Sequence, residues 1–166
     1  MGTSKAVIRE IKSTEYPLLR EFLYQAIYLP EGMTPPPRSV VDCPELRVYI
    51  ENFGTRPGDC CLVTEEKGRV VGAVWSRIMD DYGHIDDATP SLAISLLPEY
   101  RGQGMGTELM RTLFSLLQEK GFAQVSLSVQ TGNPAFRLYE RLGFQIVAEK
   151  ETEYLMVRTL SGLNGG

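Results

Sequence analysis

Apolar residues recur every three or four positions in several parts of the chain, which is the spacing of one buried face of a helix. The first such pattern predicts a helix from about residue 14 to 28, capped by Ser13 or Thr14. Its apolar face consists of Leu18, Leu19, Phe22, Leu23, Ala26 and Ile27. A second pattern, at Leu109, Leu113, Leu116 and Leu117, predicts an amphipathic helix over residues 105–120 that ends at Gly121.

Two further helices are predicted from their end signals. Pro44 suits the first position of a helix over about residues 44–53. Asn133 and Pro134 suit the N-cap and first turn of another helix, which Gly143 ends. Residues 29–38 hold four prolines and a glycine and are predicted to form a loop.

Short apolar or alternating runs predict seven strands, at residues 6–11, 60–64, 70–78, 92–97, 125–129, 144–149 and 154–159. Residues 65–68 read as a hairpin turn, and residues 79–90 as a polar, turn-rich stretch. The order of elements predicts a mixed α/β fold: a central, mostly antiparallel mixed sheet of about six to seven strands, flanked by four helices. The length of 166 residues suits a single domain over residues 1–160, followed by a disordered tail at 161–166.

Charge and composition narrow the classes of partner. The formal net charge is -4 and no basic tract occurs, which disfavours nucleic-acid binding. No stretch is long and apolar enough to span a membrane, and the first ten residues lack the apolar core of a signal peptide, so we expect a cytoplasmic protein. Cys43, Cys60 and Cys61 are expected to be small buried or half-buried hydrophobes, with a reactive thiol as the alternative. With one histidine, no metal site is expected.

The segment from Arg101 to Gly106 carries the clearest chemistry. Its glycines allow close backbone approach to a ligand, and the first N–H groups of the following helix form an anion site to which Arg101 adds a charged donor. The spacing fits neither the Walker loop, which needs a lysine, nor the Rossmann fingerprint. The loop alone therefore indicates phosphate binding, with a simple surface turn as the alternative.

Two motifs resemble signatures of the GNAT superfamily of N-acetyltransferases. The loop Arg-Gly-Gln-Gly-Met-Gly at 101–106 is similar to the family's acetyl-CoA loop, Arg/Gln-x-x-Gly-x-Gly/Ala. The stretch Asn-Pro-Ala-Phe-Arg-Leu-Tyr-Glu-Arg-Leu-Gly-Phe at 133–144 is similar to its second signature, Asn-Pro-Ala-x-x-Leu-Tyr-x-x-Leu-Gly-Phe. The element order matches along nearly the whole chain, although the first fifty residues match only in pattern. The resemblance implies a GNAT-like fold.

The resemblance also implies acetyl-CoA as cosubstrate and a set of residues that bind it. The pantetheine arm would pair with the backbone of strand 92–97 in a gap between the fourth and fifth strands, and the diphosphate would meet the amides that follow Arg101. The implied cofactor-binding residues are Leu96, Leu97, Arg101, Gly102, Gln103, Gly104, Met105, Gly106, Thr107, Asn133, Ala135, Phe136 and Tyr139.

The resemblance implies fewer catalytic residues than cofactor-binding residues. Tyr139 matches the family tyrosine that protonates the departing thiolate, with a packing aromatic as the alternative. Many relatives carry a glutamate that acts as general base early in the fourth strand, where this chain has Ser91. Asp86 and His84 are the nearest substitutes, and Asp87 and Glu31 are further ones. Solvated turn residues, or a water chain, are equally open interpretations.

The acceptor pocket is expected in the least family-like segments, at residues 28–33 and 82–87 and at Trp75, with Trp75 as a core residue the alternative. Glu31, Trp75 and Asp87 are the predicted substrate-binding residues, and the acidic ones favour a cationic acceptor.

The resemblance therefore implies an N-acetyltransferase, of the acyltransferase class, that acetylates the amine of a small molecule or peptide by direct attack in a ternary complex. A non-catalytic acyl-CoA-binding sensor or regulatory module is the alternative, and transfer to a hydroxyl or of a longer acyl chain stays open. In the family that the chain resembles, exposed C-terminal strands often pair, so the resemblance makes a homodimer possible.

Overall fold

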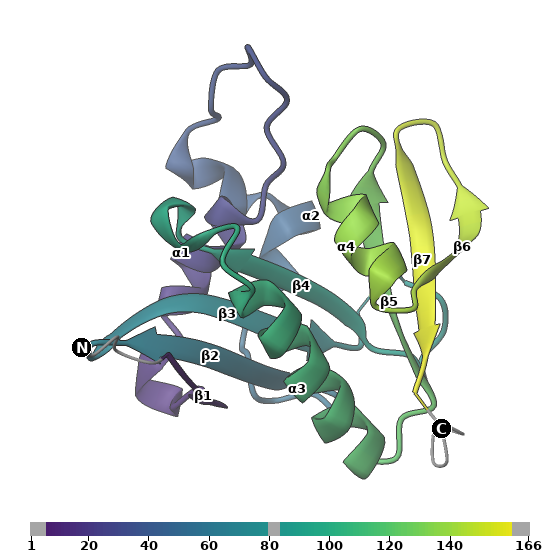
Figure 1. The fold of residues 1–166 in the computed structure, drawn as a ribbon, viewed down its shortest axis with the longest axis horizontal. Coiled ribbons are helices and arrows are strands. Elements are labelled where there is room, and N and C mark those ends of the chain that lie inside the picture. Colours follow the sequence, from purple (N-terminus) through teal and green to yellow (C-terminus); the bar gives the residue numbers. More distant parts are fainter. Residues whose placement is uncertain (1–5, 80–83, 161–166) are drawn as a thin grey trace.

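The computed structural model describes residues 6–79 and 84–160 (Figure 1). Its centre is a seven-stranded sheet in the order β1-β2-β3-β4-β5-β7-β6. Neighbouring strands are antiparallel except for β4 and β5, which are parallel. The strands are β1 (Val7–Glu10), β2 (Cys60–Glu66), β3 (Arg69–Arg77), β4 (Ser91–Leu96), β5 (Gln124–Gln130), β6 (Gln145–Glu149) and β7 (Glu153–Thr159). The predicted mixed, mostly antiparallel sheet is confirmed.

Four α-helices occur in the described ranges, the number predicted, although the first is shorter than the predicted 14–28: α1 (Leu18–Gln25), α2 (Pro44–Arg47), α3 (Met105–Glu119) and α4 (Ala135–Arg141). Short 3₁₀ turns lie at Ser13–Glu15, Arg38–Asp42 and Pro98–Tyr100. Within these ranges no helix has the length and apolar character needed to cross a membrane. The proposed tail at 161–166 lies outside the described residues.

The sheet separates two apolar cores, because successive side chains of a strand point to opposite faces. On one face, α3 packs Leu109, Leu113 and Leu117 against a cluster that includes Val74 of β3. On the other face, α1 packs against a cluster that includes Ala73 and Trp75 of the same strand. We refer to these as the α3 face and the α1 face.

The second helix is shorter than predicted. It ends at Arg47, and the chain continues through turns to Phe53 instead of remaining helical. The carbonyls of Val48 and Glu51 accept hydrogen bonds from the guanidinium of Arg77, at 3.0 and 2.6 Å. In a helix that continued to residue 53, the Val48 carbonyl would accept from the Asn52 amide. Asn52 instead has a φ of 51°, in the left-handed region, and the Val48 carbonyl accepts from Arg77, so tertiary structure outweighs the local pattern.

The sheet opens between β4 and β5, which share the single register pair Ser91 and Ser126. Beyond that point the half of the sheet that contains β5, β7 and β6 diverges from the half that contains β1 to β4 (Figure 1). Ser91 is 1% exposed, and the hydroxyls of the two serines lie 3.4 Å apart, so the pair closes the narrow end of the gap.

Candidate active site

The backbone of β4 presents polar groups to this gap. In an antiparallel pair, residues alternate between hydrogen-bonding their neighbour and pointing away from it. The Leu97 amide donates to the Val71 carbonyl at 2.9 Å, which fixes the alternation along β4. Ile94 and Leu96 are therefore turned away from β3, and their N–H and C=O groups face the gap. An extended ligand can pair with them as an added strand would.

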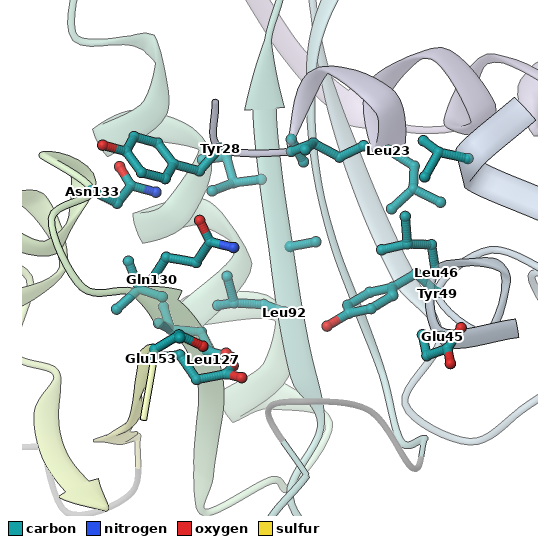
Figure 2. Close-up of a pocket in the computed structure, with 18 of the residues that line it drawn as sticks. Leu23, Tyr28, Glu45, Leu46, Tyr49, Leu92, Leu127, Gln130, Asn133 and Glu153 are labelled. Atoms are coloured by element: carbon teal, nitrogen blue, oxygen red, sulfur yellow. Dashed lines mark hydrogen bonds between the residues drawn. The ribbon is translucent and has the colours of Figure 1, made fainter. Parts of the chain in front are cut away.

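A pocket of about 530 Å³ occupies the opening (Figure 2). Leu92, Ile94 and Tyr139 line it from the α3 face, whereas Leu23 and Tyr49 line it from the α1 face. Its remaining lining residues are Ala26, Ile27, Tyr28, Pro36, Val40, Cys43, Glu45, Leu46, Ala93, Leu127, Ser128, Val129, Gln130, Asn133, Thr152 and Glu153. Two reactants can thus approach one point from opposite faces of the sheet.

The glycine loop lies between the end of β4 and the start of α3. Gly102 and Gly104 have φ values of 76° and 86°, in the left-handed region that favours glycine. Gly104 is the N-cap of α3, and the first helical bond runs from the Glu108 amide to its carbonyl at 3.2 Å. The amides of residues 105–107 consequently have no intrahelical acceptor, and they form an anion site at the helix N-terminus.

Arg101 is folded back against the body of the protein. Its Nε donates to the Leu96 carbonyl at 3.1 Å, and its terminal NH2 donates to the Gln25 carbonyl at 3.2 Å. The side chain therefore ties the loop to the end of β4 and to α1. Since it remains exposed, its positive charge still contributes to the field around the anion site.

The other residues of this region that were predicted to bind the cofactor differ in how exposed they are to solvent. Gln103 is exposed and donates to the Glu99 carbonyl at 3.0 Å, and Gly106 and Thr107 are half-buried in the first turn of α3. Leu97 and Met105 are buried in the core of the α1 face. Leu97 and Met105 can therefore contribute to a ligand site through the backbone only.

Tyr139 lies on α4 and is half-buried at the pocket wall. Its ring packs edge-on against Phe144 with centroids 6.0 Å apart, so it has a packing role as well as access to the pocket. Burial raises the pKa of Tyr139 to about 12, and the phenol stays protonated at neutral pH. A protonated hydroxyl at this position can donate to a developing anion.

The other predicted residues of the second motif have different surroundings. The side-chain oxygen of Asn133 accepts from the Ala135 amide at 2.9 Å, which caps α4, and Asn133 also lines the pocket. Ala135 is half-buried at the start of α4. Phe136 packs against Tyr154, with ring centroids 5.3 Å apart, and is not among the pocket residues.

The residues predicted as candidates for the general base do not line the pocket. His84 Nδ1 donates to the Met79 carbonyl at 2.8 Å, and Nε2 lies 3.9 Å from the exposed Asp87. Asp86 is exposed and accepts from the Ala88 amide at 2.9 Å, and its hydrogen bond with Thr89 lowers its pKa. Both features are those of a solvated turn. Tyr82, in the predicted acceptor stretch, lies outside the described residues.

Trp75 and Glu31 are also placed away from the pocket. Trp75 is fully buried in the core of the α1 face, and its Nε1–H donates to the Tyr49 carbonyl at 3.1 Å. The structure therefore places it behind the pocket wall, where it positions Tyr49, and favours the core alternative. Glu31 is exposed in the proline-rich loop, whereas Tyr28, at the start of that loop, lines the pocket.

The sequence analysis missed the residues that form the α1-face end of the pocket. Glu45 and Leu46 come from α2, Tyr49 from the turn after it, Gln130 from β5 and Glu153 from β7 (Figure 2). None belongs to either motif. The one available signal is alternation along β5, which puts Ser126, Ser128 and Gln130 as a polar row on one face.

Comparison of the sequence with known proteins finds acetyltransferases. The mouse protein "N-acetyltransferase family 8 member 3" is 32% identical over 110 residues, which cover 66% of this chain and 47% of that protein. Mycothiol acetyltransferase of Arthrobacter sp. (strain FB24) is 32% identical over 89 residues, covering 53% of this chain and 28% of that protein. The chain thus spans less than half the length of these two curated relatives.

Solved structures share the fold. PaiA N-acetyltransferase from Thermoplasma acidophilum, in complex with coenzyme A, superposes with a TM-score of 0.70 at 18% identity, covering 93% of this chain and 99% of that chain. The model of the Acetyltransferase (GNAT) family matches residues 22–144, which include the gap between β4 and β5, the glycine loop and Tyr139. This chain belongs to the GNAT family of acetyltransferases.

Proposed function

We propose that this protein is an acetyl-CoA-dependent N-acetyltransferase that acetylates an amine of a small molecule or peptide by direct attack in a ternary complex. The observation that carries the proposal is the opening of the sheet after the Ser91–Ser126 pair, which creates a pocket lined from both faces. Strand β4, which borders this opening, runs on into the glycine loop, whose residues are not among those that line the pocket. A site open from two faces lets donor and acceptor meet without a covalent enzyme intermediate.

The residues present fit coenzyme A. The amides of residues 105–107 supply donors for a diphosphate, and the gap-facing backbone of Ile94 and Leu96 supplies partners for the amides of a pantetheine arm. When bound, acetyl-CoA provides an activated acetyl thioester. The acceptor nitrogen forms a C–N bond to the acetyl carbon, the C–S bond breaks, the nitrogen loses a proton and the thiolate gains one.

Tyr139 is the proposed donor to that thiolate. Its pKa of about 12 keeps the phenol neutral at pH 7, so its hydroxyl can stabilise the charge that develops on sulfur by donating a hydrogen bond. The alternative of a non-catalytic acyl-CoA sensor would leave this protonated hydroxyl at the pocket wall without a chemical role.

The test combines calorimetry with a thiol-release assay. We expect acetyl-CoA to bind and free thiol to appear only when an amine is added. Binding without thiol release across primary amines and peptide N-termini would favour the sensor, and absence of binding would remove the proposal. Cytoplasmic location and homodimer formation stay predictions, which fractionation and light scattering can check.

A further inference from the structure

The charges that line the pocket all have one sign. Among the described lining residues, the only ionisable side chains charged at neutral pH are those of Glu45 and Glu153. Neither carboxylate forms an ion pair with a described residue. Two carboxylates without a countercharge attract cations and repel anions, so the pocket selects for a positively charged acceptor.

Glu153 is held at the edge of the gap. It is the first residue of β7, pairs in register with Gln130 of β5, and is half-buried. The hydroxyl of Ser128 donates to its Oε1, which fixes the carboxylate against β5. Because β5 forms one side of the opening towards β4, an ammonium held by Glu153 lies next to the gap in which the pantetheine arm is proposed to run.

Glu45 belongs to the opposite wall. It is exposed on α2, and Figure 2 shows it across the pocket from Glu153, beside Tyr49. The turn that follows α2 is anchored to the core through the Tyr49 carbonyl, which accepts from Trp75. The turn next to Glu45 is thus held in place by the core. In Figure 2, Glu45 lies on the opposite side of the pocket from β5 and Glu153.

The α1-face surface between the two carboxylates has an apolar part. Leu46 and the ring of Tyr49, both half-buried, form it on the α2 side (Figure 2). Burial of methylene groups on such a surface stabilises a complex by about 0.8 kcal/mol for each group removed from water. A chain of methylenes with a positive charge at each end complements this arrangement of charge and apolar surface.

We infer that the acceptor is an aliphatic amine with a second cationic group, of the alkyl diammonium class. This inference rests on the proposed function and names its substrate class. Glu153 binds the reacting nitrogen beside the gap, and Glu45 binds the distal cation. Both residues determine specificity.

The test compares putrescine with butylamine, which has the same carbon chain and one ammonium group. Thiol release gives kcat/KM for both amines with the wild-type protein and with Glu45→Gln, Glu153→Gln and the control Glu149→Gln. Glu149 is exposed on the neighbouring strand β6 and does not line the pocket. Melting temperature and CoA affinity, measured on all four proteins, establish that each variant is folded and binds the donor.

We expect the wild-type protein and Glu149→Gln to favour putrescine by about fivefold, the upper range for an exposed ion pair. Glu45→Gln should lose this preference and keep its rate with butylamine. Glu153→Gln should lose about 10- to 100-fold with both amines, as expected for a hydrogen-bonded charge pair.

Equal rates with the two amines, a preference that persists in Glu45→Gln, or CoA binding with neither amine acetylated would each overturn the inference. A protein that fails to bind CoA would instead remove the proposed function.

Discussion

Gly104 and Gly106 offer a matched pair of substitutions in the anion site. Gly104 has φ 86° and ψ −4°, and a Cβ added there would meet nothing within 4 Å. Gly104→Ala therefore introduces backbone strain of about 1–2 kcal/mol without a steric clash. Gly106 lacks a positive φ, and an added Cβ would lie 3.7 Å from Ile94, an ordinary contact. Gly106→Ala should gain stability, because alanine favours a helix over glycine.

The strained backbone in Gly104→Ala can have two structural consequences. If the loop keeps its shape, the folded state stores the strain, and the melting temperature falls by about 2–8 °C for a chain of this size. If the loop shifts, the amides of residues 105–107 move out of line, and CoA affinity falls by up to about 30-fold.

Scanning calorimetry and titration calorimetry on both variants measure these outcomes. Gly106→Ala should bind CoA as the wild-type protein does. The reasoning would be refuted if Gly104→Ala matched the wild-type protein in both assays while Gly106→Ala lost CoA affinity.

Three further predictions concern separate parts of the molecule. Tyr139→Phe should lower kcat about 100-fold and leave CoA affinity unchanged, because only the hydroxyl is removed; unchanged turnover would eliminate the acid role. Trp75→Phe removes the indole N–H that donates to the Tyr49 carbonyl and should cost about 1 kcal/mol of unfolding free energy while raising the acceptor KM, and an unaltered urea midpoint would contradict this. Hydrogen bonding to Arg9 lowers the pKa of Glu15 to about 2, so its stabilisation is present above the unfolded pKa of about 4.5 and is lost as pH falls towards 2. Glu15→Gln should flatten that acid dependence in denaturant titrations, and an unchanged slope would exclude this source.

The sheet and the backbone geometry of the glycine loop were predictable because their signals are local. The glycine spacing from Gly102 to Gly106 appears as a left-handed bend and a helix N-terminus, features that a few adjacent residues specify. The strand order follows from hairpins and from two strand-helix-strand units. The separation of β4 from β5 was predicted from the family resemblance alone, because no local sequence pattern specifies it.

The acceptor end could not be predicted, because distant segments assemble it. Glu45 and Glu153 lie more than a hundred positions apart and meet across the pocket through the packing of α2 and the pairing of β7 with β5. Just after α2, Arg77 of β3 donates to the carbonyls of Val48 and Glu51, and Asn52 has a φ of 51°, so the chain does not stay helical to residue 53. Trp75, predicted to bind the acceptor, lies in the core behind the pocket wall, where its indole donates to the Tyr49 carbonyl.

Backbone amide NMR during titration with CoA tests the central claim most directly. Bound CoA is expected to slow hydrogen exchange at the amides of Ile94 and Leu96, which face the gap, and to shift those of residues 104–107. Both effects should saturate together at one equivalent. CoA that binds with its changes confined to other segments, or that causes no change, would contradict the account.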